Sequence, residues 1–150
     1  MSAGGVHPAF LDELQRALKS ELGARSIYAQ LAPRMRDREL AQVLGSFHED
    51  EEQLVAGVRG LLVGLGARRV PTHSRTRALA GWVLAILARG RSSSIALRLC
   101  LESESAGARA WRDHAFHLAR AGDPERARAC EGFAQVKLRH ARILETWVAR

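Results

Sequence analysis

The stretch Glu104-Ser-Ala-Gly-Ala-Arg-Ala-Trp111 has a counterpart earlier in the chain, Glu21-Leu-Gly-Ala-Arg-Ser-Ile-Tyr28. Each stretch places a glutamate seven residues before an aromatic residue, with Gly and Ala-Arg between them. Seven residues make about two helical turns, so the acid and the ring lie on one helix face. An acid on the buried face of a helix is unfavourable unless it is paired or bound to a cation. The repeated pattern therefore predicts a helical bundle with a polar layer near its middle.

Apolar residues at steps of three and four predict four long helices that contain these two stretches. Gly66 is expected to end the second helix. Within Gly122-Asp123-Pro124, the glycine ends one helix, Asp123 caps the next and proline opens it. Counting outward from the turns places Glu104 level with His140. The expected helices cover residues 6–32, 37–65, 94–121 and 124–150.

A basic segment, residues 67–76, and a short apolar helix, Leu79 to Leu87, separate the second and third long helices. The apolar helix is too short to span a bilayer, so we expect a connector helix and no transmembrane segment. Residues 1–150 then form a single all-α domain, a four-helix bundle with one long crossover. The connector is apolar on several sides, which predicts a homo-oligomer formed through it.

Charge and cysteine content narrow the possible classes of protein. The net charge is +7 and is carried by arginine, with only two lysines, which we interpret as a solvated helix surface. Binding to nucleic acid is not expected. Cys100 and Cys130 fall within apolar helical patterns, as is typical of buried thiols in a reduced cytoplasm. Residues 1–8 lack a basic segment followed by an apolar one, so no signal peptide is expected and a cytoplasmic location is predicted.

Several catalytic patterns are missing from the sequence. It has no Gly-rich phosphate loop, no Ser or Cys nucleophile beside an evident base, and no zinc-type cysteine spacing. His114 and His117 are three residues apart, and His48 precedes the acidic run Glu49 to Glu52. We interpret both groups as exposed helix faces. An enzymatic activity is therefore not the favoured interpretation.

The predicted arrangement resembles the ferritin-like superfamily. Its bundles hold two metal ions with a single glutamate on helices one and three and Glu-x-x-His on helices two and four. Glu21 and Glu104 match the single-glutamate positions. The other two motifs depart from the pattern, with Asp50-x-x-Gln53 on the second long helix and Lys137-x-x-His140 on the fourth.

The chain is also similar, over nearly its whole length, to a bacterial family of small ferritin-like four-helix proteins known only as a domain of unknown function. The similarity rests on three stretches in the same order: Ala78-Leu-Ala-Gly-Trp82, Cys100-Leu-Glu-Ser-Glu104 through Trp111, and Phe133-Ala-Gln-Val-Lys-Leu-Arg-His140. Such a resemblance implies a fold and no established reaction.

Lys137 decides between two interpretations of the core. It is protonated near neutral pH and repels a divalent cation, and it can pair with Glu104 instead. We therefore predict a metal-free, salt-bridged core without cofactors, a degenerate metal site with remnant positions Glu21, Asp50, Gln53, Glu104, Lys137 and His140. The alternative is one iron, manganese or zinc ion held by Glu21, Asp50 or Glu51, Glu104 and His140.

Three functions follow from these interpretations. The favoured one is a non-enzymatic bundle that binds an unidentified protein partner or self-associates. The first alternative is a metal-binding oxidoreductase or metal-storage protein, as the superfamily resemblance implies. The second is a basic stress protein that associates with nucleic acid, suggested by the net charge and by DNA-protecting members of that superfamily.

Overall fold

The structure, a computed structural model, describes residues 6–90 and 93–150, and this part is all-helical with no strand. Residues 1–8, where no signal peptide is expected, fall partly outside the described residues. The predicted long helices are confirmed within two residues at each end. The shorter α3 begins at Arg75, before the predicted Leu79. The helices are α1 (Pro8–Leu31), α2 (Arg38–Gly64), α3 (Arg75–Leu87), α4 (Ser93–Arg120) and α5 (Pro124–Val148), with a 3₁₀ turn η1 (Ala32–Arg34) after α1.

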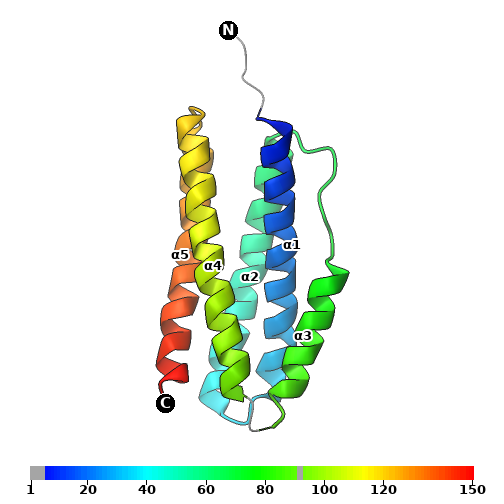
Figure 1. The fold of residues 1–150 in the computed structure, drawn as a ribbon, viewed down its shortest axis with the longest axis vertical. Coiled ribbons are helices and arrows are strands. Elements are labelled where there is room, and N and C mark those ends of the chain that lie inside the picture. Colours follow the sequence, from blue (N-terminus) through cyan, green and yellow to red (C-terminus); the bar gives the residue numbers. More distant parts are fainter. Residues whose placement is uncertain (1–5, 91–92) are drawn as a thin grey trace.

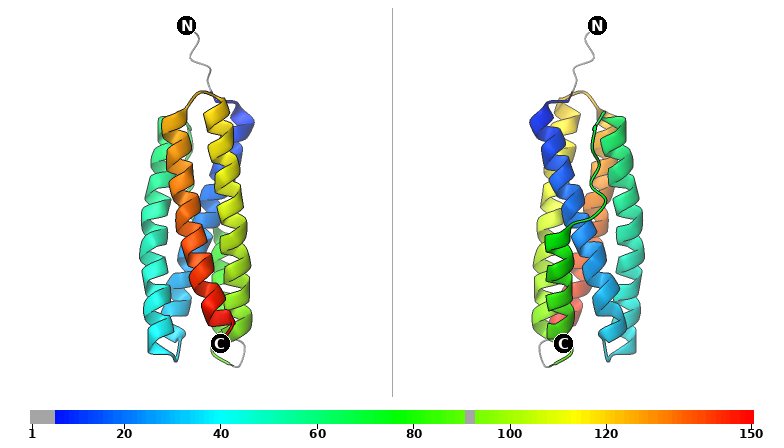
Figure 2. Two further views of the ribbon diagram at one scale, coloured as in Figure 1. Left: turned by 90° about the vertical axis from the view of Figure 1, so that its left-hand side faces the viewer. Right: turned by 90° about the vertical axis from the view of Figure 1, so that its right-hand side faces the viewer.

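The four long helices lie side by side in one bundle, with α1 antiparallel to α2 and α4 antiparallel to α5 (Figure 1). Residues 65–74 and α3 bring the chain back along the outside of α1 (Figure 2). As a result, α2 and α4 run in the same direction. This is the predicted crossover, with α3 as the connector helix.

Short-range signals in the sequence set the helix ends. Gly66 and Gly122 have φ values of +81° and +82°, in the left-handed region that glycine adopts without strain. The Asp123 side chain accepts a hydrogen bond from the backbone nitrogen of Arg126 at 3.1 Å, and so caps α5 as predicted. Asp37 caps α2 in the same way.

A layer of charged side chains divides the core into two apolar clusters. One cluster contains Leu14, Leu18 and Trp111, and the other contains Tyr28 and Phe47. Both cysteines are buried and free, as predicted. The buried charged and polar residues of the layer are Glu21, Glu51, Glu104, Lys137 and His140. The polar layer predicted from the repeated stretch is therefore present.

α3 turns small residues toward the bundle and large apolar residues away from it. Gly81, Ala85 and Ala88 are buried. A Cβ atom on Gly81 would lie 3.3 Å from the backbone nitrogen of Ile27 in α1, so a small residue is needed for this close approach. The outward residues are between 37% and 61% exposed: Leu79, Trp82, Val83, Ile86 and Leu87. In the described part of the chain, no helix combines the length and apolarity needed to cross a membrane.

A pair of substitutions in α3 tests this orientation. Ala85→Leu should lower the free energy of unfolding by roughly 1–3 kcal/mol, because the added atoms have no space against α1. Leu79→Ser changes an outward side chain and should stay within about 0.5 kcal/mol of the wild type. Urea unfolding of the three proteins measures both effects. Equal effects of the two changes would contradict the orientation.

Candidate functional site

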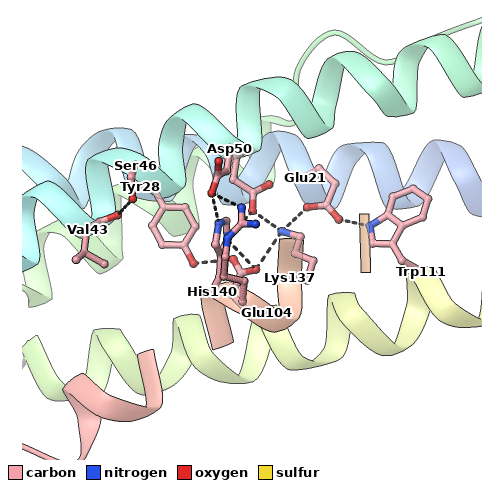
Figure 3. Close-up of polar contacts among 11 residues, drawn as sticks. Glu21, Tyr28, Val43, Ser46, Asp50, Glu104, Trp111, Lys137 and His140 are labelled. Carbon is pink, nitrogen blue, oxygen red and sulfur yellow. Dashed lines mark hydrogen bonds and ion pairs between the residues drawn. The ribbon is translucent and has the colours of Figure 1, made fainter. Parts of the chain in front are cut away.

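Lys137 of α5 lies at the centre of the charged layer (Figure 3). Its Nζ atom is 2.5 Å from Glu21 Oε2 in α1, 2.6 Å from Glu51 Oε1 in α2 and 3.4 Å from Glu104 Oε2 in α4. Burial disfavours the ammonium form, but the charges of Glu21, Glu104 and Glu51 outweigh burial and hold the pKa of Lys137 well above its ordinary value. Every long helix therefore contributes one side chain to a single ion cluster.

The structure confirms one prediction about this cluster and corrects another. Lys137 pairs with Glu104 as predicted, and the carboxylates of Glu21 and Glu51 lie closer still to its Nζ atom. Gln53 was a predicted core position, but it is exposed, and Glu51 is fully buried. The inward stripe of α2 already contained Glu51 in the sequence, between Phe47 and Leu54. The buried acid of this run is therefore Glu51, one residue later than the predicted Asp50.

His140 lies beside Lys137 and is also fully buried. Its Nε2 atom is 2.9 Å from Asp50 Oδ2, at the edge of the layer. Its Nδ1 atom is 3.4 Å from Glu104 Oε2 and 3.6 Å from Glu51 Oε1. The Phe47 ring stacks on the imidazole with 3.9 Å between ring centroids. These contacts fix the direction in which each ring nitrogen points, and they confirm that His140 and Glu104 lie at one level.

Burial and the neighbouring charges shift the pKa values of the cluster in both directions. Burial alone would lower the pKa of His140, but Glu104, Glu51 and Asp50 raise it to about 9. Burial raises the pKa of Glu21 to about 7, although Lys137 acts in the opposite direction. Burial also disfavours ionised Glu104, yet Lys137 and His140 outweigh it and lower the pKa of Glu104. Near neutral pH the cluster therefore combines a protonated imidazole with an ionised Glu104 and with a Glu21 carboxyl that is close to half protonated.

The aromatic residues of the repeated stretch exchange partners. Tyr28 Oη donates a hydrogen bond to Glu104 Oε1 at 2.6 Å, and Trp111 Nε1 donates one to Glu21 Oε1 at 2.7 Å. The two rings lie on opposite sides of the cluster along the bundle (Figure 3). Each ring therefore orients the glutamate of the other copy. The sequence predicted a shared helix face for ring and acid, but not this exchange.

Some polar atoms of the charged layer have hydrogen-bond partners, and others do not. Both oxygens of Glu21 have partners, Trp111 and Lys137. Within the described residues, three atoms of the layer are buried without a hydrogen-bond partner: Glu51 Oε2, Glu104 Oε2 and His140 Nδ1. One ligand atom from each of these three residues lies within 4.8 Å of the others.

Two carboxylates and an imidazole form a ligand set that suits divalent transition metals. The candidate ligands are therefore Glu51, Glu104 and His140. Glu21 and Asp50, which the sequence placed in the alternative ligand set, are held by other side chains.

A cleft between α1 and α4, with a volume of about 380 Å³, reaches this layer from the surface. Glu21, Trp111 and Lys137 line it, and much of its wall consists of small residues such as Ala106 and Gly107. A solute therefore has a path to the ammonium side of the cluster.

The other residues singled out in the sequence have packing roles. The His117 ring stacks on Phe10 with 4.2 Å between centroids, and His114 meets Phe10 and Trp111 edge to face. Burial raises the pKa of the Cys100 thiol to about 12, which makes it a poor nucleophile. None of these residues joins the charged layer.

Comparison of the chain with protein-family models, with curated proteins and with solved structures finds no match. The fold and the site alone therefore define the class of protein. It is an all-α bundle whose core holds an ion cluster with contributions from its four long helices.

The two lysines of the chain provide a matched test of the cluster. Lys137→Met leaves three buried carboxylates without their ammonium and should lower the free energy of unfolding by about 3–5 kcal/mol at neutral pH. The loss should shrink at lower pH as the carboxylates bind protons. Lys19→Met makes the same chemical change at an exposed position and should stay within about 0.5 kcal/mol of wild type. Similar losses for both variants would mean that the cluster does not stabilise the fold.

Stability should also depend on pH through His140. Its pKa is raised on folding from 6.5 to about 9. The raised pKa adds roughly 3 kcal/mol to the free energy of unfolding below pH 6.5. This contribution is lost as the pH rises through about 9. Denaturant unfolding of chelator-treated protein across this range measures the loss. Asp50→Asn removes the carboxylate charge beside Nε2 and should move the loss to lower pH. A flat stability profile for the wild type would contradict the raised pKa of His140.

Proposed function

We propose that this chain is a ferritin-like four-helix bundle protein that binds one divalent metal ion at Glu51, Glu104 and His140. The observation that carries the proposal is the convergence of one ligand atom from each of three buried side chains, each of which also has a buried polar atom without a hydrogen-bond partner. A buried polar atom left unpaired is unfavourable by about 1–3 kcal/mol. One cation next to all three would satisfy them together.

The spacing and orientation of the ligand atoms support this proposal. Ligand atoms around a tetrahedral ion with bonds of 2.0–2.1 Å lie about 3.3–3.4 Å apart. The separations from His140 Nδ1, 3.4 Å to Glu104 Oε2 and 3.6 Å to Glu51 Oε1, are close to this value. Glu51 Oε1 also binds Lys137, and Oε2 of the same carboxylate has no hydrogen-bond partner. Asp50 accepts a hydrogen bond from Nε2, which directs the lone pair of Nδ1 toward the two carboxylates. A carboxylate behind a histidine is the usual support of a metal ligand.

The balance of charge supports one ion rather than two. When ionised, Glu21, Glu51 and Glu104 carry three negative charges, and the ammonium of Lys137 supplies one positive charge. A divalent ion that displaces the proton of His140 brings the sum to zero. In the full ferritin-like pattern, four carboxylates balance two divalent ions. Lys137 in this chain thus replaces both a carboxylate and an ion, so it argues against a second metal ion and not against the first.

The path of the chain supports the ferritin-like part of the proposal. A single glutamate on each of α1 and α4 faces the cluster, α2 contributes Glu51, and α5 contributes Lys137 and His140. One long crossover joins two antiparallel hairpins, as in ferritin-like bundles.

A bound ion would supply a Lewis-acid centre, or a redox centre if it is iron or manganese. Tyr28 donates to Glu104 Oε1 and so leaves Oε2 turned toward His140. The metal-free core predicted from the sequence is the competing proposal.

Metal analysis distinguishes the two proposals. Protein purified without chelators, or titrated by calorimetry with zinc, manganese or anaerobic iron(II), should bind one ion per chain and unfold at a higher temperature. Glu104→Gln should abolish binding because it removes a ligand charge. Asp50→Asn, which leaves all three ligands in place, should weaken binding by roughly 10–100-fold.

His114→Ala is the matched control, because this histidine lies outside the layer, and it should bind like the wild type. Wild-type protein that binds none of the three metals, with no rise in its unfolding temperature, would establish the metal-free core instead.

A further inference from the structure

The net positive charge of the chain is concentrated in one segment. Residues 53–101 contain eight arginines and none of the chain's 16 acidic residues. The remainder of the chain is nearly neutral, with 15 basic and 16 acidic residues. The charge of +7 is therefore not spread evenly along the chain. It falls on α3 and on the segments before and after it. The fold positions α3 on the outside of the bundle (Figure 2).

The outward face of α3 is an apolar stripe. It consists of Leu79, Trp82, Val83, Ile86 and Leu87, spaced by three and four residues along the helix, and all five are exposed. The small residues of the opposite face pack on α1, so the bundle itself does not bury the stripe.

Exposed arginines flank the stripe. Arg75 is the first residue of α3, and Arg89 follows its last turn. The surface therefore combines a hydrocarbon face with cations at both ends. No acidic residue lies on α3 or on the segments next to it.

We propose that α3 binds the surface of an anionic lipid membrane, with the apolar stripe in the headgroup boundary and the arginines on lipid phosphates. Trp and aliphatic side chains on one face, with arginines beside them, are characteristic of helices that lie in this boundary. Thirteen residues give a helix about 20 Å long, which lies flat on the bilayer and does not cross it. Anionic lipid attracts each nearby basic residue with about 1 kcal/mol.

Two other occupants fit the surface less well. A second copy of the chain would cover the stripe, but it would bring its own Arg75 and Arg89, and the segment has no acid to pair with them. Nucleic acid would neutralise the arginines but would leave the stripe in water. Lipid is the occupant that satisfies both the charge and the apolar face. The proposal is independent of metal binding in the core.

Vesicle flotation tests the proposal. The full chain should float with vesicles of equal parts phosphatidylcholine and phosphatidylglycerol, and should stay in solution with phosphatidylcholine alone. Added salt should weaken binding because it screens the arginines. The emission of Trp82 should shift to shorter wavelength on binding, and Trp82→Phe should remove that shift.

Two pairs of variants locate the binding surface. Arg75→Gln with Arg89→Gln should weaken partitioning about 30-fold, the equivalent of about 1 kcal/mol for each arginine. Arg109→Gln with Arg128→Gln, an exposed pair on α4 and α5 with the same charge change, should have little effect. Ile86→Ser should weaken binding by more than about tenfold, whereas Phe116→Ser, an exposed apolar residue near the far end of α4, should not.

Several results would overturn the proposal. Failure of the chain to float with anionic vesicles is one, and equal weakening of flotation by both charge pairs is another. A dimer in light scattering without lipid that Ile86→Ser dissociates would identify a second copy as the occupant. Binding of duplex DNA that Arg75→Gln with Arg89→Gln abolishes, without binding to vesicles, would identify nucleic acid.

Discussion

A lysine ammonium buried among three carboxylates is the interaction on which the rest of this bundle depends. In a core of low dielectric constant, neither the cation nor the anions are tolerated alone. Lys137 can satisfy Glu21, Glu51 and Glu104 only if the helices that carry them meet at one height. The apolar clusters above and below would accept small sliding movements of the helices. The ion cluster does not, and so it sets the register of the fold.

The fold was largely predictable from the sequence, because helix faces and helix ends are encoded locally. The apolar periodicity located the helices, and Gly66 and Asp123 marked ends that the structure confirms. The inward direction of Glu21, Glu104, Lys137 and His140 follows from the same periodicity.

The details of the site depend on contacts between helices, which periodicity does not contain. In the polar run Asp50-Glu51-Glu52-Gln53, each residue is hydrophilic, so composition does not show which one is buried. The spacing from Phe47 and Leu54 indicates Glu51, whereas the comparison with Glu-x-x-His led to the prediction of Asp50 and Gln53 instead. The exchange of partners between Tyr28 and Trp111 depends on contacts between helices. The residues that it joins are 76 and 90 positions apart in the sequence. The outward face of α3 was visible as excess apolarity, but its direction depended on how closely Gly81 approaches α1.

The exchanged hydrogen bonds of Tyr28 and Trp111 also reveal an approximate two-fold axis perpendicular to the bundle. This axis relates the α1–α2 hairpin to the α4–α5 hairpin. Near it, the second helices of the hairpins contribute Glu51 and Lys137, which bind each other at 2.6 Å. Two identical hairpins would bring acid against acid or base against base at this point. The core thus needs two unlike halves, and no assembly of one half with itself can reproduce it.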